Sequence, residues 1–205
     1  MLEAYNSTLP YRLAFAATFF LSLGICDWIK HPENPTRVRE YLFLIFSMLL
    51  SIVYGIDHDH ITCSISPEYF LKAKGLESDP RPFRLAVTWL AIKASYSPGA
   101  LAGALMLIAN NPSAKKAQLS YQHLLRICVY PVGGAAVCAC VCGVLAAFFG
   151  HRTWFADAAN LFAPATRVIP FLAVAGIHAG SYLGATLGTV LAVATVVRSR
   201  KTLEV

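Results

Sequence analysis

The sequence is poor in charged residues. Only 14% of its 205 residues are Asp, Glu, Lys or Arg, whereas 57% are hydrophobic. Soluble domains carry roughly 25% charged residues, which cover their surface. The shortage therefore excludes an ordinary soluble domain and indicates an integral membrane protein.

The chain also lacks the features of three other protein classes. Its 17 Lys and Arg residues form no basic face with interleaved aromatic residues, so we expect no nucleic-acid partner despite the net charge of +6. No low-complexity tract or clear internal repeat is present, so an inverted-repeat transporter is not supported. Four of the six cysteines lie in one apolar stretch, which argues against a disulfide framework and favours packing thiols.

What the sequence does contain is a series of long apolar stretches. In lipid, only helices and closed barrels satisfy every backbone polar group, and these stretches are too long for barrel strands. The first stretch can also lie in the membrane interface, so we expect an all-α, polytopic transmembrane bundle of four to five helices. The expected helices cover residues 11–29, 41–56, 85–109, 127–150 and 169–197. They form a single domain over residues 1–202, and residues 203–205 look like a tag remnant.

Glycines recur every four residues along the last stretch. Such spacing forms a smooth ridge on a helix, against which another backbone can pack closely. We expect the ridge to meet a groove at Gly99 and Gly103, or the same ridge of a second copy in a homo-oligomer. The ridge consists of Gly176, Gly180, Gly184 and Gly188.

Lys and Arg are slightly more frequent on the side of the membrane where the chain ends. The positive-inside rule then predicts a multi-pass protein of the cell (inner) membrane with a cytoplasmic C-terminus. The long polar segment 57–84 is expected on the outer side.

The polar segment 57–84 holds the richest chemistry. It includes His58, Asp59 and Glu68, and imidazoles and carboxylates are the usual ligands of zinc and iron. His178 is the only histidine or charged residue in the stretch 169–197, and an ionisable group inside a membrane usually has a partner. At 1.5 Å per residue it lies roughly 14 Å along its helix, where it can face the polar segment. We therefore predict that His58, Asp59, Glu68 and His178 bind a divalent transition metal, zinc or iron.

Other polar residues lie at a similar level. Lys93 needs either an anion from another helix or a path along which its side chain reaches the membrane surface. We expect Asp59 or Glu68 to supply the anion and all three residues to act in catalysis. Tyr54 and Tyr182 each lie one helical turn from a predicted histidine ligand, so either is a candidate hydrogen-bond partner or an interfacial tyrosine.

These residues also form recognisable motifs. VYGI-x-HD-x-x-T, PEYF and H-x-x-SY resemble those of a family of small bacterial multi-pass membrane proteins, and the resemblance covers most of the chain. Where relatives carry a histidine beyond the EYF element, this chain has residues 71–75 without one, so the resemblance implies that His60 replaces it or that the site differs. It implies no activity. The matching positions are Tyr54, Gly55, His58, Asp59, Thr62, Glu68, Tyr69, Phe70, His178, Ser181 and Tyr182.

The sequence leaves three functions open. The first is a metal-dependent membrane enzyme, a hydrolase or an oxidoreductase, that acts on a membrane lipid or another amphipathic small molecule. The second is a component of a metal-ion or proton transporter. The third is a structural or accessory subunit in which the same residues form a metal-free polar network.

Overall fold

The computed structural model describes residues 2–113, 116–152 and 155–200, so the predicted tag remnant at 203–205 lies outside the described residues. The described part is helical, and its only bridge pairing joins Ser113 and Lys116. Four helical segments of this part are long and apolar enough to cross a membrane: Thr36–Ile65, Phe83–Ala109, Tyr121–Arg152 and Ala165–Ser199. The predicted all-α transmembrane bundle is thereby confirmed.

The chain divides into two compact units, Met1–Ile45 and Phe46–Val205. In the first unit, α1 (Leu2–Lys30) is followed by the beginning of α2 (Thr36–Ile65). The Asp27 carboxylate accepts a hydrogen bond of 2.8 Å from the backbone N–H of Arg37. This contact satisfies one of the free N–H groups at the start of α2 and favours the turn between the two helices.

The second unit holds the rest of α2 and the remaining helices. Its long helices are α3 (Phe83–Ala109), α5 (Val129–Phe149) and α7 (Val168–Ser199). The connecting helices are η1 (Tyr69–Ala73), η2 (Leu76–Ser78), α4 (Tyr121–Ile127), η3 (Gly150–Arg152), α6 (Phe155–Asn160) and η4 (Ala165–Arg167).

Helix α2 is longer than the sequence predicts. It ends at Ile65 rather than at residue 56, so the first third of the expected polar loop is helical. The hydropathy pattern placed the end too early because it treats polar side chains as exposed. Asp59 and Thr62 are instead buried, with 6% and 1% of their surface exposed, and the helix continues because other helices cover them.

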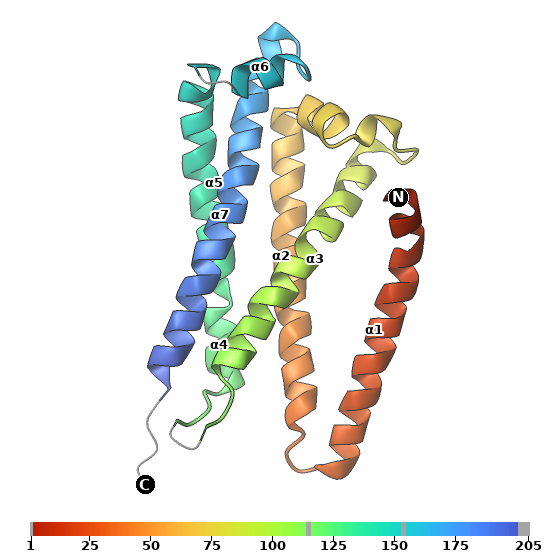
Figure 1. Cartoon of the computed structure of the whole chain (residues 1–205), viewed down its shortest axis with the longest axis vertical. Helices are drawn as coiled ribbons and strands as arrows, with labels where there is room; N and C mark the ends of the chain where they lie inside the picture. Colours follow the sequence, from red (N-terminus) through yellow and green to blue (C-terminus); the bar gives the residue numbers. More distant parts are fainter. Residues whose placement is uncertain (1, 114–115, 153–154, 201–205) are drawn as a thin grey trace. The chain divides into compact units, whose positions relative to one another are not determined.

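The glycine ridge of α7 packs against α5 within the same chain (Figure 1). A Cβ atom added at Gly184 would overlap the backbone of Gly134, and one at Gly188 would overlap that of Tyr130. The expected groove at Gly99 is wrong as a partner for the ridge, because Gly99 lies against α2 and accepts a hydrogen bond of 2.7 Å from Ser47. Since α5 covers the ridge, the ridge gives no support to a homo-oligomer.

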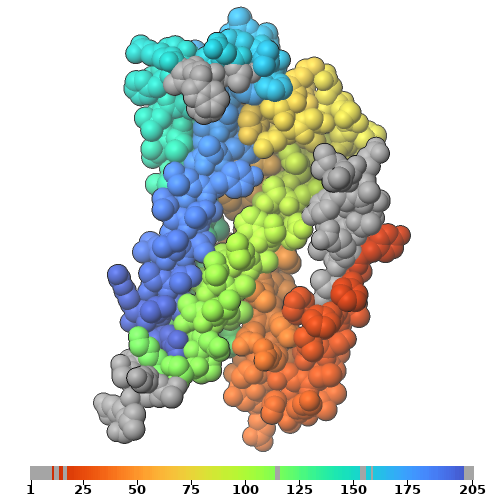
Figure 2. All heavy atoms as spheres, in the orientation of Figure 1, coloured from red at the N-terminus to blue at the C-terminus, as the bar shows by residue number. Residues whose placement is uncertain are grey.

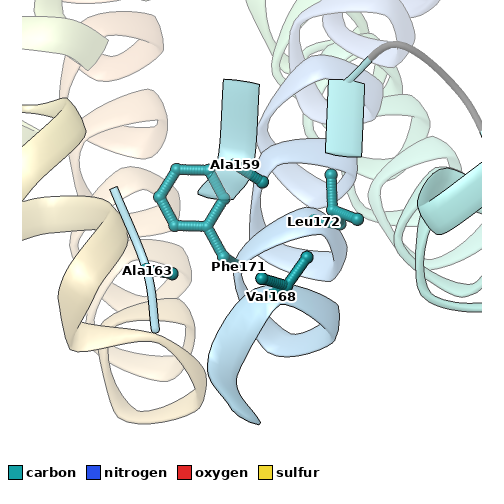
Figure 3. Close-up of a cluster of buried hydrophobic side chains, with 5 residues drawn as sticks. All are labelled: Ala159, Ala163, Val168, Phe171 and Leu172. Carbon is teal, nitrogen blue, oxygen red and sulfur yellow. The ribbon is translucent and has the colours of Figure 1, made fainter. Parts of the chain in front are cut away.

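A small apolar cluster closes one end of the second unit. It joins α6 and the segment after it to the first turns of α7, with Phe171 at its centre (Figure 3). Tyr69 of η1 packs against the cluster, so η1 and the α6 region meet at this end (Figure 2). The buried members are Ala159, Ala163, Val168, Phe171 and Leu172.

Candidate metal centre

Three of the predicted ligands lie together inside the second unit. His58 and Asp59 come from the C-terminal part of α2, and His178 comes from α7. Each offers one ligand atom, and these atoms all lie within 4.8 Å of one another. Asp59 and His178 each expose only 6% of their surface. The arrangement is a buried group of two imidazoles and one carboxylate.

Hydrogen bonds orient this group. The Nδ1 atom of His58 lies 3.0 Å from Oδ1 of Asp59, and Nε2 of His178 lies 3.9 Å from the same oxygen. Thr62 donates its hydroxyl to the carbonyl of His58 at 2.8 Å, and its oxygen is 3.4 Å from Nε2 of His178. Oδ1 of Asp59 therefore lies near both rings, which also contact each other directly, edge to face, with 4.6 Å between their centroids.

One ring nitrogen of the group has no partner. Among the described residues, Nε2 of His58 is the buried side-chain nitrogen or oxygen without a hydrogen bond. Such an atom is costly to bury, so it calls for an explanation such as an ion or a water molecule. If Nδ1–H donates to Asp59, Nε2 presents its lone pair and is the ring nitrogen of His58 that can accept a proton donor or bind an ion.

Aromatic rings cover His178 from the side of η1. The ring of Tyr69 stacks on His178 with 4.8 Å between centroids, and the ring of Phe70 meets it edge-on at 5.6 Å. Burial raises the pKa of Tyr69 to about 12, so its phenol stays protonated at neutral pH. These two rings keep water away from one side of the group.

A cavity of about 100 Å³ adjoins the three residues. Tyr54 and Tyr182 both line it. The hydroxyl of Tyr54 bonds Ser181 at 2.9 Å, so its hydrogen bond is to α7 rather than to His58. Most of its lining residues come from α2, α3 and α7, and Gly55 of α2 packs closely against Ser95 of α3.

Glu68 lies outside the group. Its Oε1 is 3.1 Å from Nε of Arg167, and its Oε2 accepts a hydrogen bond of 3.0 Å from Ser66. Burial alone would raise the pKa of Glu68, but its own backbone N–H, Arg167 and Ser66 together lower it below the ordinary value of 4.5. Arg167 also donates to the carbonyl of Ile65 at 2.8 Å. Glu68 thus ties the end of α2 to the start of α7.

The other predicted site residues also lie elsewhere. Nζ of Lys93 is 6.0 Å from the centre of the Trp89 ring on its own helix. Nε2 of His60 is 2.8 Å from the hydroxyl of Thr88 on α3. The structure therefore brings together His58, Asp59 and His178, and places Glu68, Lys93 and His60 in other contacts.

The functional interpretation rests on the geometry of this centre. Comparison of the chain with family models, curated proteins and solved structures finds no match. The resemblance of the motifs to a bacterial membrane family stays a prediction.

Two residues near the candidate site, Arg167 and Lys74, are not predicted from the sequence. Arg167 comes directly before the last apolar stretch, on the membrane side where Glu68 lies, and this position was the available signal for their salt bridge. Lys74 lines the cavity, but nothing in the pattern of the sequence distinguishes it from the other lysines of its segment.

Proposed function

We propose that this protein is a membrane-embedded metalloenzyme in which His58, Asp59 and His178 hold a zinc or iron ion. The observation that carries the proposal is the buried convergence of the three donor groups, with Nε2 of His58 lacking a partner. Two imidazoles and one carboxylate form the ligand set of many zinc hydrolases and of non-haem iron oxygenases. An ion held there supplies Lewis acidity or, in the case of iron, oxygen activation.

The cavity favours an enzyme over a purely structural metal site. Structural zinc sites are usually closed by four protein ligands, whereas three protein ligands leave a position for water or substrate. The adjoining 100 Å³ corresponds to the liquid volume of about three water molecules. The space next to the three ligands therefore suits a small reacting group.

The small volume and the partly apolar lining of the cavity favour an amphipathic substrate. A whole drug-sized molecule needs about 300 Å³ or more, so only a small part of a substrate fits. Apolar side chains, including Leu90, Pro98 and Ala185, share the lining with the polar residues. A lipid or similar molecule can place its polar group beside the three residues while its apolar part stays among the helices.

The first test is the metal content of the purified protein. Full-length protein, produced in medium supplemented with zinc and iron and purified without chelator, is expected to contain close to one equivalent of one of these metals. Inductively coupled plasma mass spectrometry measures it. Protein that holds no metal would contradict the proposal and leave a metal-free polar network, built on the His58–Asp59 and Thr62–His178 contacts, in its place.

We also propose that the C-terminus is cytoplasmic and that η1 and η2 lie on the outer side, since Lys and Arg are slightly more frequent at the C-terminal side. In a cysteine-free background, a cysteine at Ser78 is expected to react with a membrane-impermeant maleimide in intact cells. A cysteine at Ser199 is expected to react only after permeabilisation. The reverse pattern would show the opposite orientation.

A further inference from the structure

One cation lines the cavity beside the three proposed ligands. Lys74, which follows η1, is the only Lys or Arg among the described residues that line this space. Its Nζ lies 5.3 Å from the centre of the Tyr69 ring, and the same ring stacks on His178. A continuous series of contacts therefore runs from Lys74 through the Tyr69 ring to His178, one of the three proposed ligands.

Three neighbouring cations at this end pair with acidic residues, and a fourth, Arg84, donates to the carbonyl of His60, to Cys63 and to Ser64. Lys72 pairs with Glu77 at 2.5 Å, and Arg81 pairs with Asp79. Arg167 pairs with Glu68, as described above. Within the described residues Lys74 has no such carboxylate, and its ammonium group remains available to an anion.

The charges around the cavity favour an anionic ligand. A divalent ion brings two positive charges, the Asp59 carboxylate cancels one, and Lys74 adds another, so the net charge at the cavity is positive. A bound ion is often the largest local charge in a site, and lysine is a common point-charge partner of phosphate. A cavity of about 100 Å³ has room for a phosphate group.

We propose that the cavity binds the phosphate group of its ligand and that Lys74 is the residue that binds this anion. The inference rests on the proposed function, because it names the substrate class of the same site. The phosphate can belong to a lipid headgroup or be free inorganic phosphate. The apolar lining formed by Leu90, Ala94 and Pro98 suits a phosphate that carries an apolar substituent.

Isothermal titration calorimetry on full-length, zinc-loaded protein in detergent tests this inference. The probes are dihexanoylphosphatidic acid, inorganic phosphate and dihexanoylglycerol, which has the same acyl chains without the phosphate. We expect the phosphatidic acid to bind more tightly than dihexanoylglycerol, and Lys74→Gln to raise its Kd by about tenfold or more, as loss of a charged hydrogen bond does. Lys74→Arg retains the charge and is expected to restore most of the affinity.

Lys72→Gln is the matched control. It removes a lysine two positions away that pairs with Glu77 and does not line the cavity, so the Kd is expected to stay within about twofold, as for most surface substitutions. Inorganic phosphate that binds as tightly as the phosphatidic acid, and with the same dependence on Lys74, would identify free phosphate as the ligand. Weaker binding of inorganic phosphate would identify a headgroup.

Equal affinity of Lys74→Gln and the wild type, or equal affinity for phosphatidic acid and dihexanoylglycerol, would overturn the inference. The zinc content of each sample separates this failure from failure of the proposed function. Bound zinc without Lys74-dependent phosphate binding overturns the inference alone. Lys74-dependent binding by protein that holds no metal supports the phosphate site and contradicts the metal centre.

Discussion

His178→Ala protein is expected to lose its affinity for zinc by about 100-fold or more, since even residues that only orient metal ligands contribute 10- to 100-fold. His178 is buried and faces Asp59 and His58, so removing its ring removes one of three donors. His58→Ala is expected to have an effect of similar size. Competition with a chromophoric zinc chelator measures both affinities.

Two variants serve as controls for this loss. His60→Ala removes a histidine that lies on α2, like His58, but contacts Thr88. Glu68→Gln removes a carboxylate that pairs with Arg167. Neither side chain belongs to the group of three, so both proteins are expected to bind zinc within about threefold of the wild type, well short of the loss expected for a ligand. His178→Gln, which keeps much of the side-chain volume, guards against a loss that comes only from unfolding. Wild-type zinc affinity in a folded His178→Ala or His178→Gln protein would remove His178 from the site.

Gly184→Leu is expected to separate α5 from α7. Even a Cβ atom at Gly184 overlaps the backbone of Gly134, and backbone cannot move aside as a flexible side chain can. Overpacking a close interface typically costs 1–3 kcal/mol, and a leucine against backbone belongs at or above the upper end of that range. The expected result is a large fall in the thermal unfolding temperature of the detergent-solubilised protein.

Gly133→Leu is the matched control for the helix interface. Gly133 is adjacent in sequence to Gly134, but a Cβ atom there meets nothing within 4 Å. The same substitution is therefore expected to leave the unfolding temperature nearly unchanged. Equal losses in Gly184→Leu and Gly133→Leu would mean that the α5–α7 contact does not depend on the glycine ridge.

The sequence predicts the helices well where apolar surface determines them. It fails at the end of α2, because hydropathy measures the polarity of a residue and not what covers it. Asp59 is polar yet buried between α2 and α7, and the contacts that allow this come from residues more than 100 positions away. Such long-range cover cannot be read from a local window.

The glycine ridge shows the same limit in packing. Its spacing indicates a close helix contact, but spacing on one helix does not identify the partner. A signal for the true partner was present on α5, where Gly134, Cys138 and Cys142 also recur every four residues. The structure shows these small side chains against Gly180 and Gly184, which confirms that the two cysteines pack.

For the candidate site, His178 was the most informative residue. An isolated histidine in an apolar helix implies a polar partner at the same depth, and Asp59 and His58 are close to it. Glu68 was harder to place because α2 ends at Ile65 and Pro67 follows. The chain turns there toward Arg167, which supplies the charge partner of Glu68 at the end of the bundle.

X-ray absorption spectroscopy at the metal edge tests most directly whether His58, Asp59 and His178 bind one metal ion. Metal-loaded wild-type protein is expected to show nitrogen and oxygen ligands at about 2.0–2.2 Å, with the outer-shell scattering of imidazole rings. His178→Gln is expected to weaken the imidazole signal. Sulfur ligands at about 2.3 Å would assign the metal to cysteines instead, and a metal without imidazole scattering would contradict the account.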